Sequence, residues 1–256
     1  MELDRFALTA EQLAGIPTNE RTLLVLLGHG LNEINVLDKL VFFSTKNLRP
    51  DSPSVLVSAH ECQAMVLART LMGKLHAVHE VLKVCYFQTP LNKLYVNLLD
   101  EQTSAALARL NSYFGSTNFI TKLRNEIAFH YDPHNGSGEI PGVELVNEFA
   151  MYLHPTIGNC FYQFSEVMVS KALMDLTGKS ELFEAMTTLL DEVRQVIDDV
   201  NAVSSGLMHL VLTVHIGDSA LQASRQVVEV GEATHSDDVF IPYFFEVSPP
   251  SSLSQI

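Results

Sequence analysis

Three side chains in the segment 122–131 have the types and spacing that phosphodiester chemistry needs: Arg124, Asn125 and His130. An arginine carries a fixed positive charge and can hold two oxygens of a phosphate, whereas an unperturbed imidazole takes up or releases a proton near neutral pH. A fixed cation and a titratable base are the two groups that metal-free phosphodiester cleavage requires. This segment is therefore the candidate catalytic site, and we expect it to use no metal and no other cofactor.

The segment reads as a helix that begins at Ser116, Thr117 or Asn118 and ends at Asp132-Pro133, since proline disfavours helical geometry in the residue before it. Arg124 and His130 fall on opposite borders of one stripe of this helix, each about 60° from its centre, and differ by about 9 Å in rise. That rise is too large for an intimate pair within one helix unless the long arginine reaches, but it suits a second copy of the helix that supplies the partner. The stripe itself consists of Ile120, Leu123, Ile127 and Tyr131.

Arg124-Asn125, three further residues, Phe129 and His130 resemble the arginine, polar residue, gap and histidine of the HEPN superfamily. HEPN proteins are all-α bundles, often dimers, and many are metal-independent endoribonucleases of toxin and phage-defence systems. The resemblance implies that His130 acts as base on the ribose 2′-OH, that Arg124 stabilises charge at phosphorus and that Asn125 orients the phosphate. The implied products are a 2′,3′-cyclic phosphate and a 5′-OH.

The same resemblance implies RNA as substrate, a homodimer whose protomers share one cleft, and an antitoxin or regulatory protein as a further partner. Basic residues gather around the motif although the chain as a whole is acidic. Lys122, Arg109 and Tyr131 are accordingly the candidate contacts for the phosphates and RNA.

Two other functions remain compatible with these residues. A catalytically inactive HEPN-like bundle would bind a partner protein, and a nucleotide-binding bundle would use Arg124 to hold a phosphate without chemistry. The simplest structural interpretation is that Arg124 is a solvated cation and that His130, near the helix end, is favoured by the helix dipole and by Glu126 four residues earlier.

Composition restricts the class of protein. The chain has 256 residues, 47% apolar and 18% charged, which is sufficient for a sizeable core. Its formal charge of −14, from 16 Lys plus Arg against 30 Asp plus Glu, opposes a broad nucleic-acid interface and requires any RNA contact to be local. Three cysteines at wide spacings indicate neither a disulfide framework nor a zinc site. Apolar runs are too short to span a membrane, and the start lacks the pattern of a signal peptide, so we expect a cytoplasmic protein without membrane contact.

Helical periodicity dominates the chain and predicts an all-α bundle of about six to eight helices over residues 1–216. Residues 217–256 form a C-terminal extension with a tail, in which 226–230 and 239–247 have the β-rich composition of short strands, although Pro242 argues against a central one. The last helix carries a candidate interruption at Ser204-Ser-Gly206. The predicted helices cover about 20–49, 53–82, 100–113, 116–132, 143–152, 158–176 and 181–216.

Two weaker constellations lie on the first two long helices. His76 and His79, with Glu80, have a spacing that could present two ligands to a metal, but helix histidines are more often surface or core residues. Gly28-His29-Gly30 follows no predicted strand, so close helix packing is a better interpretation than a phosphate loop.

Overall fold

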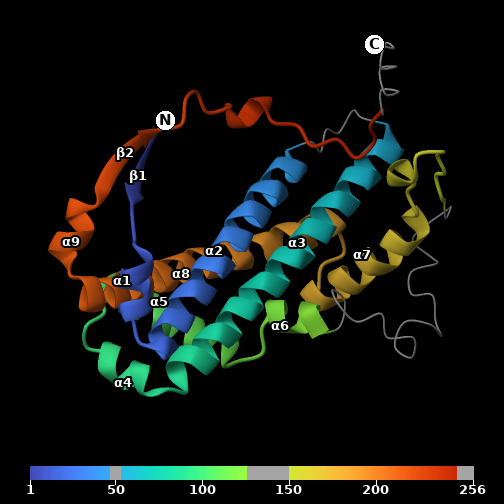
Figure 1. Cartoon of the computed structure of the whole chain (residues 1–256). Coiled ribbons are helices and arrows are strands. Elements are labelled where there is room, and N and C mark those ends of the chain that lie inside the picture. Colours follow the sequence, from blue (N-terminus) through green and yellow to red (C-terminus); the bar gives the residue numbers. More distant parts are fainter. Residues whose placement is uncertain (47–52, 126–149, 247–256) are drawn as a thin grey trace, which may run out of the picture.

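The computed structural model describes residues 1–46, 53–125 and 150–246, and it confirms the predicted all-α class. Two long helices, α2 (Thr18–Thr45) and α3 (Ser54–Leu82), run antiparallel along their lengths and pack on α8 (Leu182–Ile216) (Figure 1). α5 (Glu101–Phe114) packs on α8, and α7 (Gln163–Thr177) packs on α8 and the start of α3. One hydrophobic core joins these helices, and its centre contains Leu23, Leu27, Leu71, Leu75, Leu110, Leu189 and Val200.

Two glycines allow helices to approach closely. A Cβ on Gly30 of α2 would lie 2.4 Å from Cγ2 of Val78 on α3, which confirms that the glycine there serves helix packing. A Cβ on Gly206 of α8 would lie 2.2 Å from Oγ1 of Thr103 on α5. The predicted interruption at Ser204–Gly206 is wrong, because α8 runs unbroken and Gly206 is where α5 crosses it.

The connection from α3 to α5 consists of two short helical segments. α3 continues into a π-helix at Lys83–Phe87, and Thr89 then caps the short α4 (Pro90–Tyr95), its hydroxyl accepting a hydrogen bond from the backbone of Leu91 at 3.3 Å. Asp100 caps α5 in the same way, accepting from Thr103 N at 2.7 Å. α5 brings the chain back to the end of α3, where Phe114 stacks on His79, and α6 (Phe119–Leu123) begins after a short turn.

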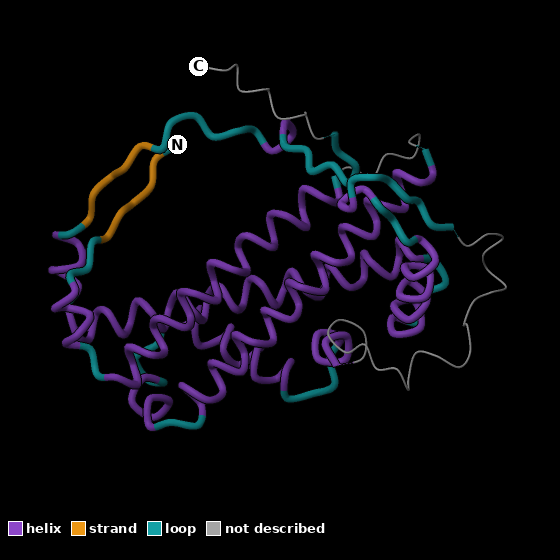
Figure 2. Tube along the Cα trace, turned by 45° about the vertical axis from the view of Figure 1, so that its right-hand side comes forward, coloured by secondary structure: helices purple, strands orange, loops and turns teal. Residues whose placement is uncertain are grey.

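The start of the chain pairs with a segment that follows α8 and forms an antiparallel ribbon. β1 (Glu2–Phe6) pairs with β2 (Arg225–Glu229), and Arg225 and Asp4 form an ion pair across it at 2.8 Å. The ribbon stands at one end of the bundle, next to α1 (Ala10–Gly15) and α9 (Asp218–Ala223) (Figure 2). The strand predicted at 226–230 is therefore confirmed apart from a shift of one residue.

Beyond the ribbon, residues 230–246 run across the bundle to its other end (Figures 1 and 2). They contain a 3-10 turn at Ser236–Asp238, and Lys46 of the α2 end pairs with Asp237 at 2.7 Å. At the far end, Asn159 donates to the backbone oxygen of Phe245 at 2.6 Å. Residues 239–246, the described part of the strand predicted at 239–247, form no strand. They are irregular, and the bond from Asn159 fixes them near Phe245.

The predicted helix over 158–176 begins only at Gln163. Tyr152 and Phe161 form an isolated antiparallel bridge, with N to O distances of 2.7 and 2.8 Å, and a 3-10 turn at Ile157–Asn159 lies between them. Of the helix predicted over 143–152, residues 150–152 are not helical, with Tyr152 held in this bridge, and the rest lies outside the described residues. No helix within the described ranges is both long and apolar enough to cross a membrane.

Candidate functional site

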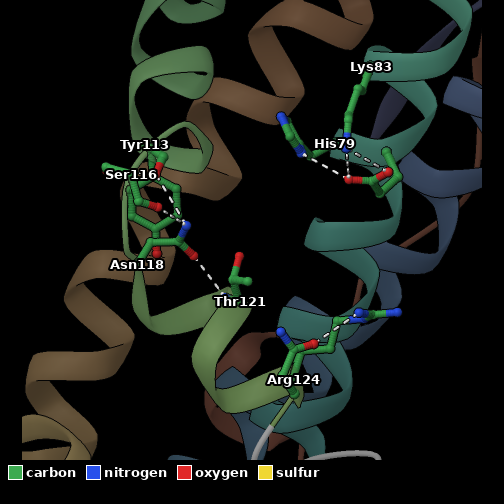
Figure 3. A network of polar contacts seen from close by, with 9 residues as sticks. His79, Lys83, Tyr113, Ser116, Asn118, Thr121 and Arg124 are labelled. Atoms are coloured by element: carbon green, nitrogen blue, oxygen red, sulfur yellow. Dashed lines mark hydrogen bonds and ion pairs between the residues drawn. The ribbon is translucent and has the colours of Figure 1, made fainter.

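The helix that carries the predicted motif is fixed at its start by Asn118. The Asn118 side chain caps α6 by accepting a hydrogen bond from Thr121 N at 2.8 Å, and its amide donates to the carbonyl oxygens of Tyr113 at 3.2 Å and Ser116 at 2.9 Å (Figure 3). These bonds tie α6 to the end of α5. The direction in which α6 presents its last residues is therefore set by a buried polar anchor.

The last described residues of this segment, Arg124 and Asn125, are exposed and have π-helical geometry. Nη1 of Arg124 donates to Oδ1 of Asn125 at 3.2 Å. Ile120 and Leu123 are buried in the core, as the predicted stripe requires. A packed apolar side thus holds a solvent-facing guanidinium and amide next to each other.

A groove of about 460 Å³ opens between the end of α3, the π-helix, the end of α5 and Thr121 of α6. Its wall is built by His79 and Phe114, whose rings stack with centroids 4.1 Å apart at an interplanar angle of 14°. His76 meets Phe114 edge-on, with centroids 6.1 Å apart. Glu80 and Lys83 lie beside it and form an ion pair at 3.2 Å. Figure 3 shows Arg124 extending from α6 toward α3, the helix that carries His79.

Both imidazoles of the groove are held neutral. Burial lowers the pKa of His79 to about 4, against the opposing effect of Glu80. Burial also lowers the pKa of His76, and the nearby positive charge of Arg124 lowers it further. Nδ1 of His79 is buried without a hydrogen-bond partner among the described residues, and the nearest carboxylate oxygen, on Glu80, is 4.0 Å away. The stack on Phe114 thus keeps this nitrogen away from solvent.

The remaining predicted residues have different placements. Arg109, on α5, is bound to Asp199 of α8, with Nη2 to Oδ1 at 2.6 Å. Lys122 is half-buried and lines a separate recess with Tyr113 and Glu192, whose side chains hydrogen-bond to each other. His130 and Tyr131 lie outside the described residues. The structure thus brings Arg124 and Asn125 together and uses Arg109 to join two helices.

Sequence reasoning did not associate His76 with Arg124, which is 48 residues later in the chain. The spacing of three marks the two histidines only as weak candidates for metal ligands, and surface or core positions are the favoured interpretation. Among the described residues, no three histidine, cysteine, aspartate or glutamate side chains are grouped to hold a metal ion. A π-helix directly follows the end of α3 that carries the two histidines, a feature often found at functional sites, but it is visible only in the structure.

Comparison with family models, with curated proteins and with solved structures finds no match to this chain. Its function is therefore inferred from the residues of the site and their geometry.

Proposed function

We propose that this chain is a HEPN-like endoribonuclease that cleaves RNA without a metal at a site containing Arg124, Asn125 and His130. The observation that supports this most directly is the exposed Arg124–Asn125 pair on an anchored helix, next to a groove with neutral imidazoles. A guanidinium in that position can bind a phosphate while the groove accepts the neighbouring ribose or base.

In the proposed reaction, His130 removes the proton of the ribose 2′-OH and the 2′ oxygen attacks phosphorus. The bond from phosphorus to the 5′ oxygen breaks, the leaving oxygen takes up a proton, and the products are a 2′,3′-cyclic phosphate and a 5′-OH. Arg124 stabilises the charge that develops on the phosphate oxygens, and Asn125 orients the phosphate. No electrons are transferred, and the step needs no co-reactant beyond the protons that are exchanged.

The proposed enzyme is a homodimer. Six residues of a regular helix would rise about 9 Å, too far for Arg124 and His130 to form an intimate pair within one helix unless the long arginine side chain reaches. Two copies of the helix related by a twofold axis would place Arg124 of each protomer next to His130 of the other. Each composite site then needs both chains.

An assay with end-labelled RNA tests the proposal. We expect Arg124→Ala and His130→Ala each to lower the cleavage rate at least about 100-fold, because each removes a group that acts on the transition state. Arg5→Ala, on the distant β1 ribbon, is the matched control and should cleave like the wild type. Equal rates for wild type and His130→Ala, a product without a cyclic phosphate, or loss of cleavage in EDTA would contradict the mechanism.

Mixing the two inactive variants tests the dimer. In a heterodimer of Arg124→Ala and His130→Ala, one composite site has both native residues and the other has neither. Random exchange should therefore restore about one quarter of the wild-type rate. No recovery, despite verified subunit exchange, would place Arg124 and His130 of one chain in the same site.

Nucleotide binding without cleavage is the second candidate, and the size of the groove beside Arg124 favours it. Calorimetry with AMP and GMP distinguishes the two functions. Binding that Arg124→Ala weakens, together with RNA that stays intact, would support the binding module. RNA cleavage with a cyclic phosphate product would exclude it.

A further inference from the structure

A second cavity lies at the opposite part of α3, where this helix faces α7 and the turn that leads into α8. Its volume is about 380 Å³, within the range of small-molecule sites. Met65 and Phe161 are buried and form an apolar floor. The hydroxyls of Ser58, Ser170 and Ser180 are part of its lining. The cavity thus combines an apolar base with several groups that can donate or accept hydrogen bonds.

Some of the polar and charged side chains that line the cavity have partners within the protein. Glu166 of α7 has partners within the protein: Arg69 lies 3.8 Å from its Oε2, and the thiol of Cys62 hydrogen-bonds to it. Burial, reinforced by Glu166, raises the pKa of Cys62 to about 12, so this thiol stays protonated. Lys171, which also lines the cavity, is bound to Asp175 one helical turn later.

Glu61 differs from Glu166. It lies on α3, one residue before Cys62, is partly buried and lines the same cavity. Its carboxylate has neither a hydrogen bond nor an ion pair with another described residue. Burial raises its pKa, and no nearby cation among the described residues offsets this effect. A partly buried carboxylate without a cation has lost part of its hydration, and a cationic ligand would compensate for that loss.

We propose that this cavity binds a small organic cation, with the carboxylate of Glu61 as its counter-ion and Met65 and Phe161 against its apolar part. An anionic ligand would meet the carboxylates of Glu61, Glu166 and Glu181. A metal ion is disfavoured because the described residues contain no group of three ligating side chains. The formal charge of −14 further favours the approach of cations.

Calorimetry at pH 7.5 with three organic cations tests the proposal: the protonated amines hexylamine and 2-phenylethylamine, and the quaternary ammonium ion choline. Hexanol and hexanoate have a similar apolar chain without the positive charge, and they measure what the charge contributes. We expect at least one of the three cations to bind with a Kd of about 1 mM or less, and hexanol and hexanoate to bind at least about tenfold more weakly. Absence of binding by all three cations, or equal binding of hexanol and hexylamine, would overturn it.

Glu61→Gln should weaken binding of the cation at least about tenfold, because the negative charge that attracts an ammonium group is lost while the shape is kept. Asp191→Asn removes an exposed carboxylate of α8 that does not line the cavity, and it should leave the Kd unchanged. Ser170→Phe, which fills the cavity, should abolish binding. Thermal unfolding of each variant checks that it is folded, and an unchanged Kd in folded Glu61→Gln would refute the counter-ion role. RNA cleavage does not enter these readouts, so the two proposals stand or fall separately.

Discussion

The imidazole of His79 lies flat against the ring of Phe114, with the ring centroids 4.1 Å apart and the planes inclined by 14°. This stack joins the end of α3 to the end of α5 and forms one wall of the groove beside Arg124. It also covers His79, whose side chain is only 12% exposed. The same contact therefore shapes the candidate site and removes the histidine from water.

Stability should fall in acid because of His79. Burial holds its pKa at about 4 in the folded protein, whereas an unfolded histidine titrates near 6.5. Between these values the unfolded chain binds a proton that the folded chain does not, so the free energy of unfolding decreases as pH falls below about 6.5 and this contribution levels off below about 4. We expect His79 to account for a loss of about 1–3 kcal/mol across this window.

Chemical denaturation of wild type and His79→Phe between pH 7 and pH 4 measures this contribution. The phenylalanine keeps the stack on Phe114 but cannot take up a proton, so its stability should fall less over the same range. A direct titration of His79 by NMR provides the control. A midpoint near 6.5 would contradict the assignment to burial.

Gly206→Ala should destabilise the protein although alanine is the better helix former. The added Cβ would lie 2.2 Å from Oγ1 and 2.9 Å from Cβ of Thr103, so α5 and α8 would have to separate. Overpacking of this kind costs about 1–3 kcal/mol, more than the roughly 1 kcal/mol by which alanine favours a helix.

The double variant Gly206→Ala with Thr103→Ala tests whether this contact is the cause. Removing the threonine side chain makes room for the new methyl group, so the two substitutions together should cost less than their sum. Gly28→Ala is the matched control, because its Cβ would meet only Met208 Sδ at 3.7 Å. Additive costs for the pair would show that the strain lies elsewhere.

The long helices could be predicted from sequence because each has an apolar face of many turns. α2, α3, α5 and α8 follow their predicted ranges closely, and Asp100 caps α5 at its predicted start. The β1–β2 ribbon was harder to foresee. Every residue of both strands is exposed, so β1 shows no burial pattern, and its partner lies more than 200 residues away.

In the candidate site, too, local sequence predicts some features, whereas others depend on contacts between residues far apart in the chain. The exposed Arg124–Asn125 pair and the buried Ile120 and Leu123 follow from local helical periodicity. The proximity of Arg124 to His76 follows from the crossing of two helices, which local periodicity does not specify. The residues from 126 to 131, including His130 and Tyr131, stay predictions from the sequence.

A polar contact at the start of α2 should be important for stability. Glu20, in the first turn of α2, is only 8% exposed and contacts Nε2 of His215, at the end of α8. It also accepts a hydrogen bond from the hydroxyl of Tyr95 on α4. Burial raises the pKa of this tyrosine, and the hydrogen bond to Glu20 raises it further. Glu20→Ala leaves both partners without their acceptor and should lower the free energy of unfolding by about 1–3 kcal/mol.

Tyr95→Phe separates the two contacts of Glu20. In the wild-type background the loss of the hydroxyl should cost about 0.5–1.5 kcal/mol, measured by urea denaturation. In the Glu20→Ala background it should cost little, since the hydrogen bond is already absent. Equal costs in both backgrounds would mean that Tyr95 contributes through its ring alone.

Substitution of Arg109 should change the stability of the fold and not the affinity for RNA. Its Nε and Nη2 donate to Oδ1 of Asp199 at 3.0 and 2.6 Å, and the Asp199 side chain is only 5% exposed. Arg109→Ala leaves this carboxylate buried without its cation and should lower the unfolding midpoint, whereas Arg109→Ala with Asp199→Asn should recover part of the loss. Arg109→Lys keeps the charge but cannot form both bonds, so it should fall between wild type and alanine. Binding of RNA, measured well below the midpoint, should be unchanged in Arg109→Lys, and a selective loss of RNA affinity in this variant would instead assign Arg109 to the RNA contact.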